Sequence, residues 1–168
     1  MNNQLSLKIS DLNSPEKGEV FEKIVNEIYN REITDDNILK FERPIRNLIL
    51  IFNMHFEIMN GGLLQFIDNS TGDYFEETLD SLQALNASEF VQILNDINNK
   101  LFSSTIIPTD TESRRELIDN INESLTEEDA AKLEFFYEET DETYYQNEEL
   151  LHEYVIKFTN DLLVKQGV

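Results

Sequence analysis

The feature that most constrains the fold is a run of apolar residues at helical spacing in the first half of the chain. The apolar side chains recur at three- and four-residue steps: Ile45, Leu48, Ile49, Phe52, Phe56 and Met59, with Ile51 and Ile58 widening the stripe. Such spacing is typical of an amphipathic helix, and so wide a stripe predicts a helix that is buried over most of its surface. Pro44 stands where a helix can begin, and Gly61 with Gly62 stands where one can end. We therefore expect a central helix between these residues.

Similar patterns recur on both sides of this segment and predict further helices. Ser14 with Pro15 is typical of a helix start. Four pairs with capping-box spacing predict later starts: Asp73 with Glu76, Asn86 with Glu89, Thr109 with Glu112, and Thr126 with Asp129. Only Leu5, Leu7 and Ile9 alternate as in a strand, so residues 1–13 are expected to form a short strand or an extended arm. The prediction is an all-α, single-domain bundle of about seven or eight helices over residues 1–168.

Length and composition narrow the class of protein. A chain of 168 residues has the size of one domain and can bury roughly 70% of its unfolded surface. The chain has no Cys, which excludes disulfides, thiolate metal ligands and a Cys nucleophile. Neither a signal-peptide pattern nor an apolar stretch of the ~20 residues that a membrane span needs is present. These features lead us to expect a cytoplasmic protein.

Negative charge is segregated along the chain. The formal net charge is −21, from 34 acidic and 13 basic residues. Residues 1–46 are nearly balanced, whereas residues 47–153 hold 24 acids and only four bases, Lys100, Arg114, Arg115 and Lys132. A surface that only keeps a protein in solution usually intersperses both signs. The large negative charge disfavours nucleic acid and anionic membranes as partners and favours a basic protein surface, although a role in solubility alone stays open.

The candidate partner-binding residues are acids in the last third of the chain. Glu112, Glu116 and Asp119, followed by Glu123, fall at steps of four, three and four, which places them on one helical face. Seven more acids extend the predicted negative field: Glu127, Glu128, Glu134, Glu138, Glu139, Asp141 and Glu142. Residues four apart on a helix rise by roughly 6 Å, so such rows have a spacing comparable with a strand of phosphates.

A glycine-rich stretch follows the predicted central helix. Residues 60–73 read NGGLLQFIDNSTGD. Gly61 and Gly62 tolerate positive φ and close approach, and the amides of Gln65 and Asn69 can satisfy open backbone groups at a turn. We interpret the stretch mainly as scaffold, with a ligand or partner pocket around Gln65, Asn69 and Ser70 as the alternative.

This stretch resembles the bacterial DNA-mimic protein family, a helical domain first catalogued as of unknown function, whose hallmark is N-G-G-F-x-Q-F-F-x-N-S-x-G. Eight positions match: Asn60, Gly61, Gly62, Gln65, Phe66, Asn69, Ser70 and Gly72. Leu63 and Ile67 stand where the family has aromatic residues. The resemblance is good from about residue 47 to residue 102 and reaches the last third only in helix pattern and acidity. It implies an all-α fold, a homodimer, and an acidic face that occupies the DNA site of a transcriptional regulator.

Catalytic and metal-binding motifs are weak in this sequence. Glu149 and His152 have the E-x-x-H spacing of a di-iron helix, but a di-iron site needs a second such pair, and Phe52 stands three residues before His55 in place of Glu. His55 is therefore expected to be a core or edge histidine. No phosphate-binding loop, nucleophile elbow or calcium loop is present. We expect no catalytic residue, no metal and no cofactor.

Three functions are compatible with these features. The leading hypothesis is a non-catalytic protein that binds a basic DNA-binding protein, such as a bacterial transcriptional regulator, by imitating the phosphate backbone and competing with DNA. The first alternative is an immunity-type inhibitor of a basic toxin or nuclease. The second alternative is a small-ligand or enzyme module around residues 60–72, which a buried polar pocket there would favour and a tightly packed loop would disfavour.

Overall fold

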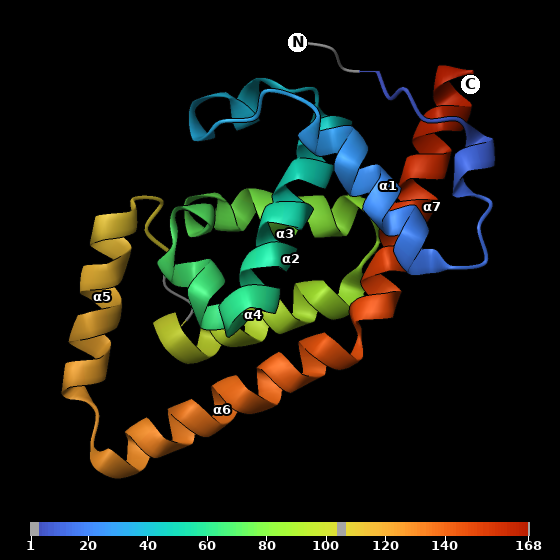
Figure 1. The fold of residues 1–168 in the computed structure, drawn as a ribbon. Helices are drawn as coiled ribbons and strands as arrows, with labels where there is room; N and C mark the ends of the chain where they lie inside the picture. Colours follow the sequence, from blue (N-terminus) through green and yellow to red (C-terminus); the bar gives the residue numbers. More distant parts are fainter. Residues whose placement is uncertain (1–3, 104–106, 168) are drawn as a thin grey trace.

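The computed structural model describes residues 4–103 and 107–167, apart from the side chains of residues 35 and 36, and this part of the chain is all-α (Figure 1). Its α-helices are α1 (Lys17–Tyr29), α2 (Arg43–Asp68), α3 (Phe75–Ala84), α4 (Ser88–Phe102), α5 (Thr111–Ser124), α6 (Glu127–Gln146) and α7 (Glu148–Gln166). Three short 3-10 helices join them: η1 (Ile9–Leu12), η2 (Asp35–Lys40) and η3 (Ser70–Tyr74). The all-α prediction is confirmed. Residues 5–7 form no strand and lead as an irregular segment into η1.

Helix α2 occupies the centre of the molecule, as its apolar stripe predicts. Ile45, Leu48, Ile49 and Phe52 are completely buried. The helix contacts α1, α3, α5 and α6, and α3 in turn packs against α4 (Figure 1). The ring of Phe66, in the last turns of α2, stacks on that of Phe75 at the start of α3, with centroids 6.0 Å apart. The core therefore forms where the widest apolar stripe meets the helices that follow it.

The C-terminal helix returns to the beginning of the chain. Helix α7 lies beside α1 and also contacts η1 (Figure 1). Val20, Phe21 and Ile24 of α1 are buried, as are Leu151 and Val155 of α7. Within the described residues, no helix is long and apolar enough to cross a bilayer.

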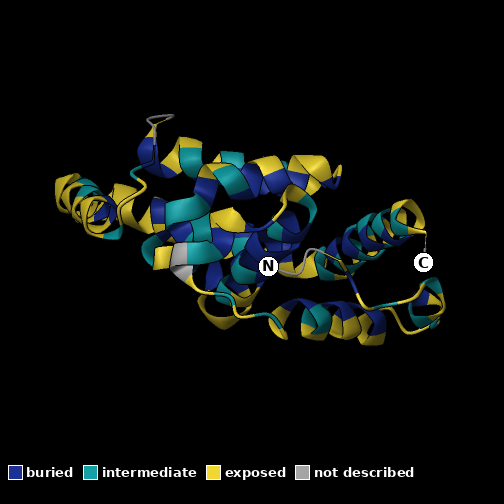
Figure 2. Ribbon diagram, turned by 90° about the horizontal axis from the view of Figure 1, so that it is seen from above, coloured by how far each residue is buried: buried dark blue, intermediate teal, exposed yellow. Residues whose placement is uncertain are grey.

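Helices α5 and α6 lie at the rim. Figure 1 shows α5 standing along one edge and α6 running along an adjacent edge beneath α2 and α4. In α5 only Arg114 and Ile118 are buried, and in α6 only Leu133, Thr140 and Tyr144. In Figure 2, buried residues gather towards the middle of the molecule and exposed ones lie on its rim. Both helices therefore present most of their circumference to solvent.

Four of the predicted helix starts are wrong. Asp110 caps α5 in place of Thr109, since its carboxylate accepts from the backbone N–H of Ser113 at 2.8 Å, and α1 begins only at Lys17, beyond Ser14 and Pro15. Thr126 does cap α6, since its hydroxyl accepts from the backbone N–H of Asp129 at 3.1 Å. Asp73, however, lies inside η3 and binds side chains of α5, so α3 begins two residues later. Asn86 has a left-handed φ of 59° and lies in the turn between α3 and α4 instead of capping α4. At Asp73 and Asn86 the alternative backbone conformation excludes the capping geometry that spacing alone suggested.

Candidate functional site

Helix α5 presents a row of carboxylates to solvent. Its inner side is marked by the buried Arg114 and Ile118. Counting 100° per residue, the four candidate acids of this helix lie on the opposite side, and all four are exposed: Glu112, Glu116, Asp119 and Glu123. None of the four forms an ion pair with a described residue. Because residues at steps of three and four share one face of a helix, these four acids form one row of negative charge that faces solvent.

Helix α6 spreads its carboxylates more widely around its axis. Its buried line is formed by Leu133, Thr140 and Tyr144. Six candidate acids are exposed around the rest of the helix: Glu127, Glu128, Glu134, Glu138, Glu139 and Glu142. Phe135 lies among them with 58% of its surface exposed. The outer side of α6 is therefore acidic with an apolar element in the middle.

Helices α5 and α6 follow one another along the chain at the rim (Figure 1), and we call their ten exposed candidate acids the acidic edge. With 14 and 20 residues, the two helices extend about 21 Å and about 30 Å. Lys132 pairs with Glu128 at 2.7 Å, while Arg115 on α5 reaches Asp68 at 3.2 Å. Because the other nine acids have no cationic partner among the described residues, the edge keeps a large excess of negative charge.

Asp141 differs from the other candidate acids. It is half-buried, and its Oδ1 accepts the backbone N–H of Leu63 at 2.7 Å. Leu63 is the first residue after the break in α2, where Gly62 has a φ of +80°. The carboxylate therefore acts as a cap for the last turns of α2, and burial raises its pKa above the usual range. This acid lies outside the acidic edge and serves the fold.

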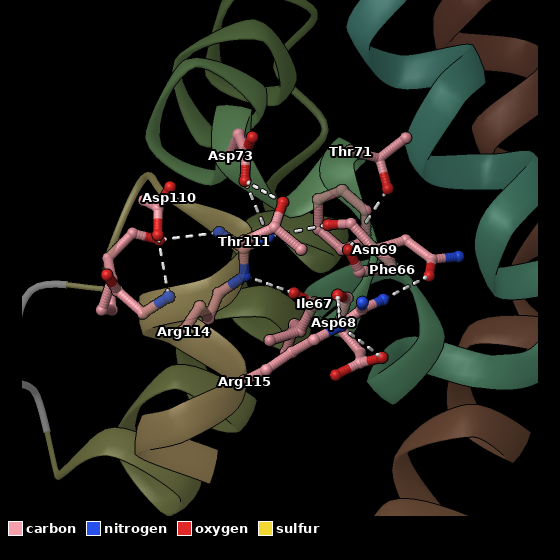
Figure 3. Close-up of polar contacts among 12 residues, drawn as sticks. Phe66, Ile67, Asp68, Asn69, Thr71, Asp73, Asp110, Thr111, Arg114 and Arg115 are labelled. Carbon is pink, nitrogen blue, oxygen red and sulfur yellow. Dashed lines mark hydrogen bonds and ion pairs between the residues drawn. The ribbon is translucent and has the colours of Figure 1, made fainter.

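The stretch 60–72 breaks α2 and then closes against α5. Arg114 is completely buried, and its guanidinium donates to three backbone carbonyl oxygens: those of Ile67, Asn69 (2.7 Å) and Pro108 (2.7 Å) (Figure 3). A fourth bond of 2.8 Å joins it to the carboxylate of Asp73. One side chain of α5 thus satisfies the open carbonyls left where α2 ends. This arrangement fixes the base of the helix that carries the acidic row.

Gly72 is required by this closure. A Cβ atom built there would lie 2.5 Å from the carbonyl oxygen of Ile67 and 2.9 Å from that of Phe66. Both atoms belong to the backbone and cannot move aside easily. Glycine at this position therefore lets η3 approach the end of α2 closely enough for Arg114 to bridge them.

Two polar side chains of the stretch share one acceptor on the preceding part of α2. Glu57 Oε2 accepts from the amides of Gln65 at 2.6 Å and Asn69 at 2.8 Å. Phe66 is buried, whereas Asn60 and Ser70 are exposed. A loop whose amides and carbonyls are already bonded in this way disfavours the ligand-pocket alternative and supports the scaffold interpretation.

Sequence reasoning missed Arg114. The sequence shows it only as one of the few basic residues in the acidic part of the chain, and a buried arginine is rare. Its spacing of four from Ile118 was the available signal, because it places a charged residue on the inner side of α5.

Both histidines lie in the interior, near the start of α7. His55 Nδ1 is 3.0 Å from the Tyr144 hydroxyl, and the His152 ring stacks on Phe21 with centroids 3.9 Å apart. Burial, with a smaller contribution from His152, lowers the pKa of His55 to about 4. Burial also lowers the pKa of His152. His55 is therefore a buried neutral imidazole at pH 7, and Glu148 lies between the two rings.

Comparison with known proteins identifies the family. The sequence profile of the DMP19-like protein family matches residues 39–158, which span α2 to α6 and the first part of α7. No curated protein and no solved structure matches the chain. The matched region contains both the glycine-rich stretch and the acidic edge. Because the match covers well over half of the chain, the chain belongs to the DMP19-like family of DNA-mimic proteins.

Proposed function

We propose that the acidic edge binds a basic DNA-binding protein on the surface that this protein uses for DNA, and so competes with DNA. The partner class that we favour is a bacterial transcriptional regulator, and the protein itself performs no catalysis in this role. The observation that carries the proposal is the solvent-facing position of ten carboxylates on α5 and α6, of which only Glu128 has a cationic partner among the described residues.

The dimensions of the edge support this proposal. A duplex carries one phosphate per ~3.4 Å along each strand, and the carboxylates of the α5 row are separated by rises of about 4.5 to 6 Å. The acids lie on two helices that meet at an angle at the rim of the molecule (Figure 1), so they extend in two directions. The likeness to a duplex lies in the spacing of negative charges, which basic side chains that bind phosphates can recognise.

The energetics of the row also favour a basic partner. Like charges at steps of three and four on a helix destabilise it by a few tenths of a kcal/mol per pair. A partner with lysines and arginines at its DNA site removes this repulsion on binding. Binding driven in this way is fast and weakens steeply with salt.

The test compares two variants with the same change in net charge. The first removes the α5 row through Glu112→Gln, Glu116→Gln, Asp119→Asn and Glu123→Gln. The control removes four exposed acids elsewhere through Glu16→Gln, Glu22→Gln, Glu32→Gln and Glu76→Gln. Proteins are captured on immobilised wild-type protein from a lysate of the source organism at low salt, and the captured proteins are then purified for affinity measurements.

We expect the capture of a DNA-binding protein that excess duplex DNA displaces. At about 0.2–1 kcal/mol per exposed pair, loss of the α5 row should weaken binding by about 1–4 kcal/mol, whereas the control should retain most of the affinity. Equal losses in the two variants would show a nonspecific effect of net charge and would refute the proposal. Capture of a nuclease or toxin whose binding DNA does not displace would favour the immunity-type alternative.

We propose in addition that the protein forms a homodimer, as the family resemblance implies. Tyr29, Phe56, Met59 and Tyr145 are large apolar side chains with 38–43% of their surface exposed. The rings of Tyr29 and Phe56 lie 6.0 Å apart, and Phe56 and Met59 share one side of α2. Sedimentation of the wild type and of a Phe56→Ser variant tests whether this patch carries self-association; a monomeric wild type refutes it.

A further inference from the structure

The structure brings three metal-ligating side chains together where α2 meets the first turns of α7. His55 comes from α2, and Glu148 and His152 come from α7, four residues apart on one helical face. Glu148 Oε1 lies 3.9 Å from His55 Nε2 and 3.8 Å from His152 Nε2. Their ligand atoms all lie within 4.8 Å of one another.

We propose that these three residues bind one divalent transition-metal ion of the zinc class. The ligands are His55 Nε2, His152 Nε2 and Glu148 Oε1. Two imidazoles and one carboxylate form a ligand set that suits Zn²⁺, and three protein ligands leave a position for water or for a further group.

The distances fit such an ion after a small contraction. Tetrahedral Zn²⁺ with bonds of about 2.0–2.1 Å holds neighbouring ligand atoms roughly 3.3 Å apart. The two measured separations exceed this value by about half an ångström. Glu148 has 37% of its side chain exposed, so a change of its rotamer can shorten both of these separations. The two histidine ligand atoms, which lie within 4.8 Å of each other, must also approach one another when the ion binds.

The local hydrogen bonding also points to a cation. His152 Nε2 is buried and has no hydrogen-bond partner among the described residues, and a buried polar atom in that state is costly. Both imidazole nitrogens face the same carboxylate oxygen at separations too long for a direct hydrogen bond. A metal ion between the three atoms would satisfy them all.

The surroundings orient the rings as metal sites require. The hydroxyl of Tyr144, a completely buried residue, lies 3.0 Å from His55 Nδ1. When Nδ1 carries the proton and donates to this oxygen, Nε2 presents its lone pair to Glu148, which is the usual role of an outer-shell partner. The stack of His152 on Phe21 holds the second ring in place. The ion would tie the start of α7 to α2.

Zn²⁺ titration of the chelator-treated full-length protein by calorimetry, in an excess of Mg²⁺, tests the proposal. We expect one Zn²⁺ per chain, and Co²⁺ in its place should give the visible absorption of a site with nitrogen and oxygen ligands. Glu148→Gln should lower the affinity for Zn²⁺ at least tenfold. Glu149→Gln removes the same charge from the neighbouring, exposed position and should change the affinity less than twofold.

A second variant keeps the outcome decisive if Glu148→Gln changes the fold. His55→Gln should abolish the absorption of bound Co²⁺ and the metal-induced shift of the His152 ring proton signals in NMR spectra. The absence of stoichiometric binding, equal effects of the Glu148 and Glu149 variants, or displacement of Zn²⁺ by Mg²⁺ would overturn the proposal. The last result would assign the binding to diffuse attraction by the acidic surface.

Discussion

The strongest single-residue prediction concerns Arg114, the buried side chain that holds α5 to the end of α2. Arg114→Met keeps the length and apolar stem of the side chain but removes the guanidinium. The carbonyl oxygens of Ile67, Asn69 and Pro108 then lose their charged donor. An unsatisfied buried acceptor costs about 1–3 kcal/mol. The pair with Asp73 adds less, because that carboxylate is 32% exposed and is screened by solvent.

These values lead us to expect a loss of about 3–5 kcal/mol in the free energy of unfolding. Water can reach some of the freed carbonyls once α5 shifts, so we place the total well below the sum of three maximal penalties. Arg115→Met is the matched control, since its guanidinium is 49% exposed and pairs with Asp68 at the surface. We expect this control to lose less than about 1 kcal/mol.

Urea denaturation followed by circular dichroism measures both losses, and hydrogen exchange locates them. Because α5 buries few other side chains, its amides should exchange faster in Arg114→Met even where the rest of the fold persists. If Arg114→Met cost no more than Arg115→Met, and if α5 kept its protection, the assignment of Arg114 as the attachment of α5 would be refuted.

Three further predictions concern local packing and pH. Gly72→Ala should lower the free energy of unfolding by about 1–3 kcal/mol, because the new Cβ meets backbone oxygens. Gly18→Ala in α1, where nothing lies within 4 Å of the new Cβ, should raise it by about 0.5–1 kcal/mol, and thermal melts compare the two variants. Asp141→Ala removes the cap on Leu63 and should lower the free energy of unfolding by about 1 kcal/mol, whereas the neighbouring Glu142→Ala should lower it by less than about 0.5 kcal/mol; urea denaturation measures both. With a chelator present, lowering the pH from 7 to 5 should reduce the free energy of unfolding of the wild type by about 2 kcal/mol more than that of His55→Gln. The reason is that His55 has a pKa of about 4 in the folded protein, whereas in the unfolded chain it takes up a proton near pH 6.5. That stability is complete above pH 6.5 and declines as the pH falls towards 4, so parallel stability curves for the two proteins would contradict it.

Short-range patterns in the sequence determined the helices and the acidic row. The stripe from Ile45 to Met59 predicted the central helix, and the four-three-four spacing of the α5 acids predicted an outward row, because both follow from the period of one helix. Thr126 was predicted as a cap for the same reason: its partner is the backbone three residues away.

Tertiary structure alone decided the contacts between distant segments. The burial of Arg114 depends on the carbonyls at the end of α2, and the use of Asp141 as a cap depends on the break at Gly62. Sequence spacing pointed to Glu149 beside His152, whereas the fold turns Glu148 towards both histidines. No local pattern encodes these partners, because a side chain's role there is set by which backbone groups and side chains the packing of other helices brings to it.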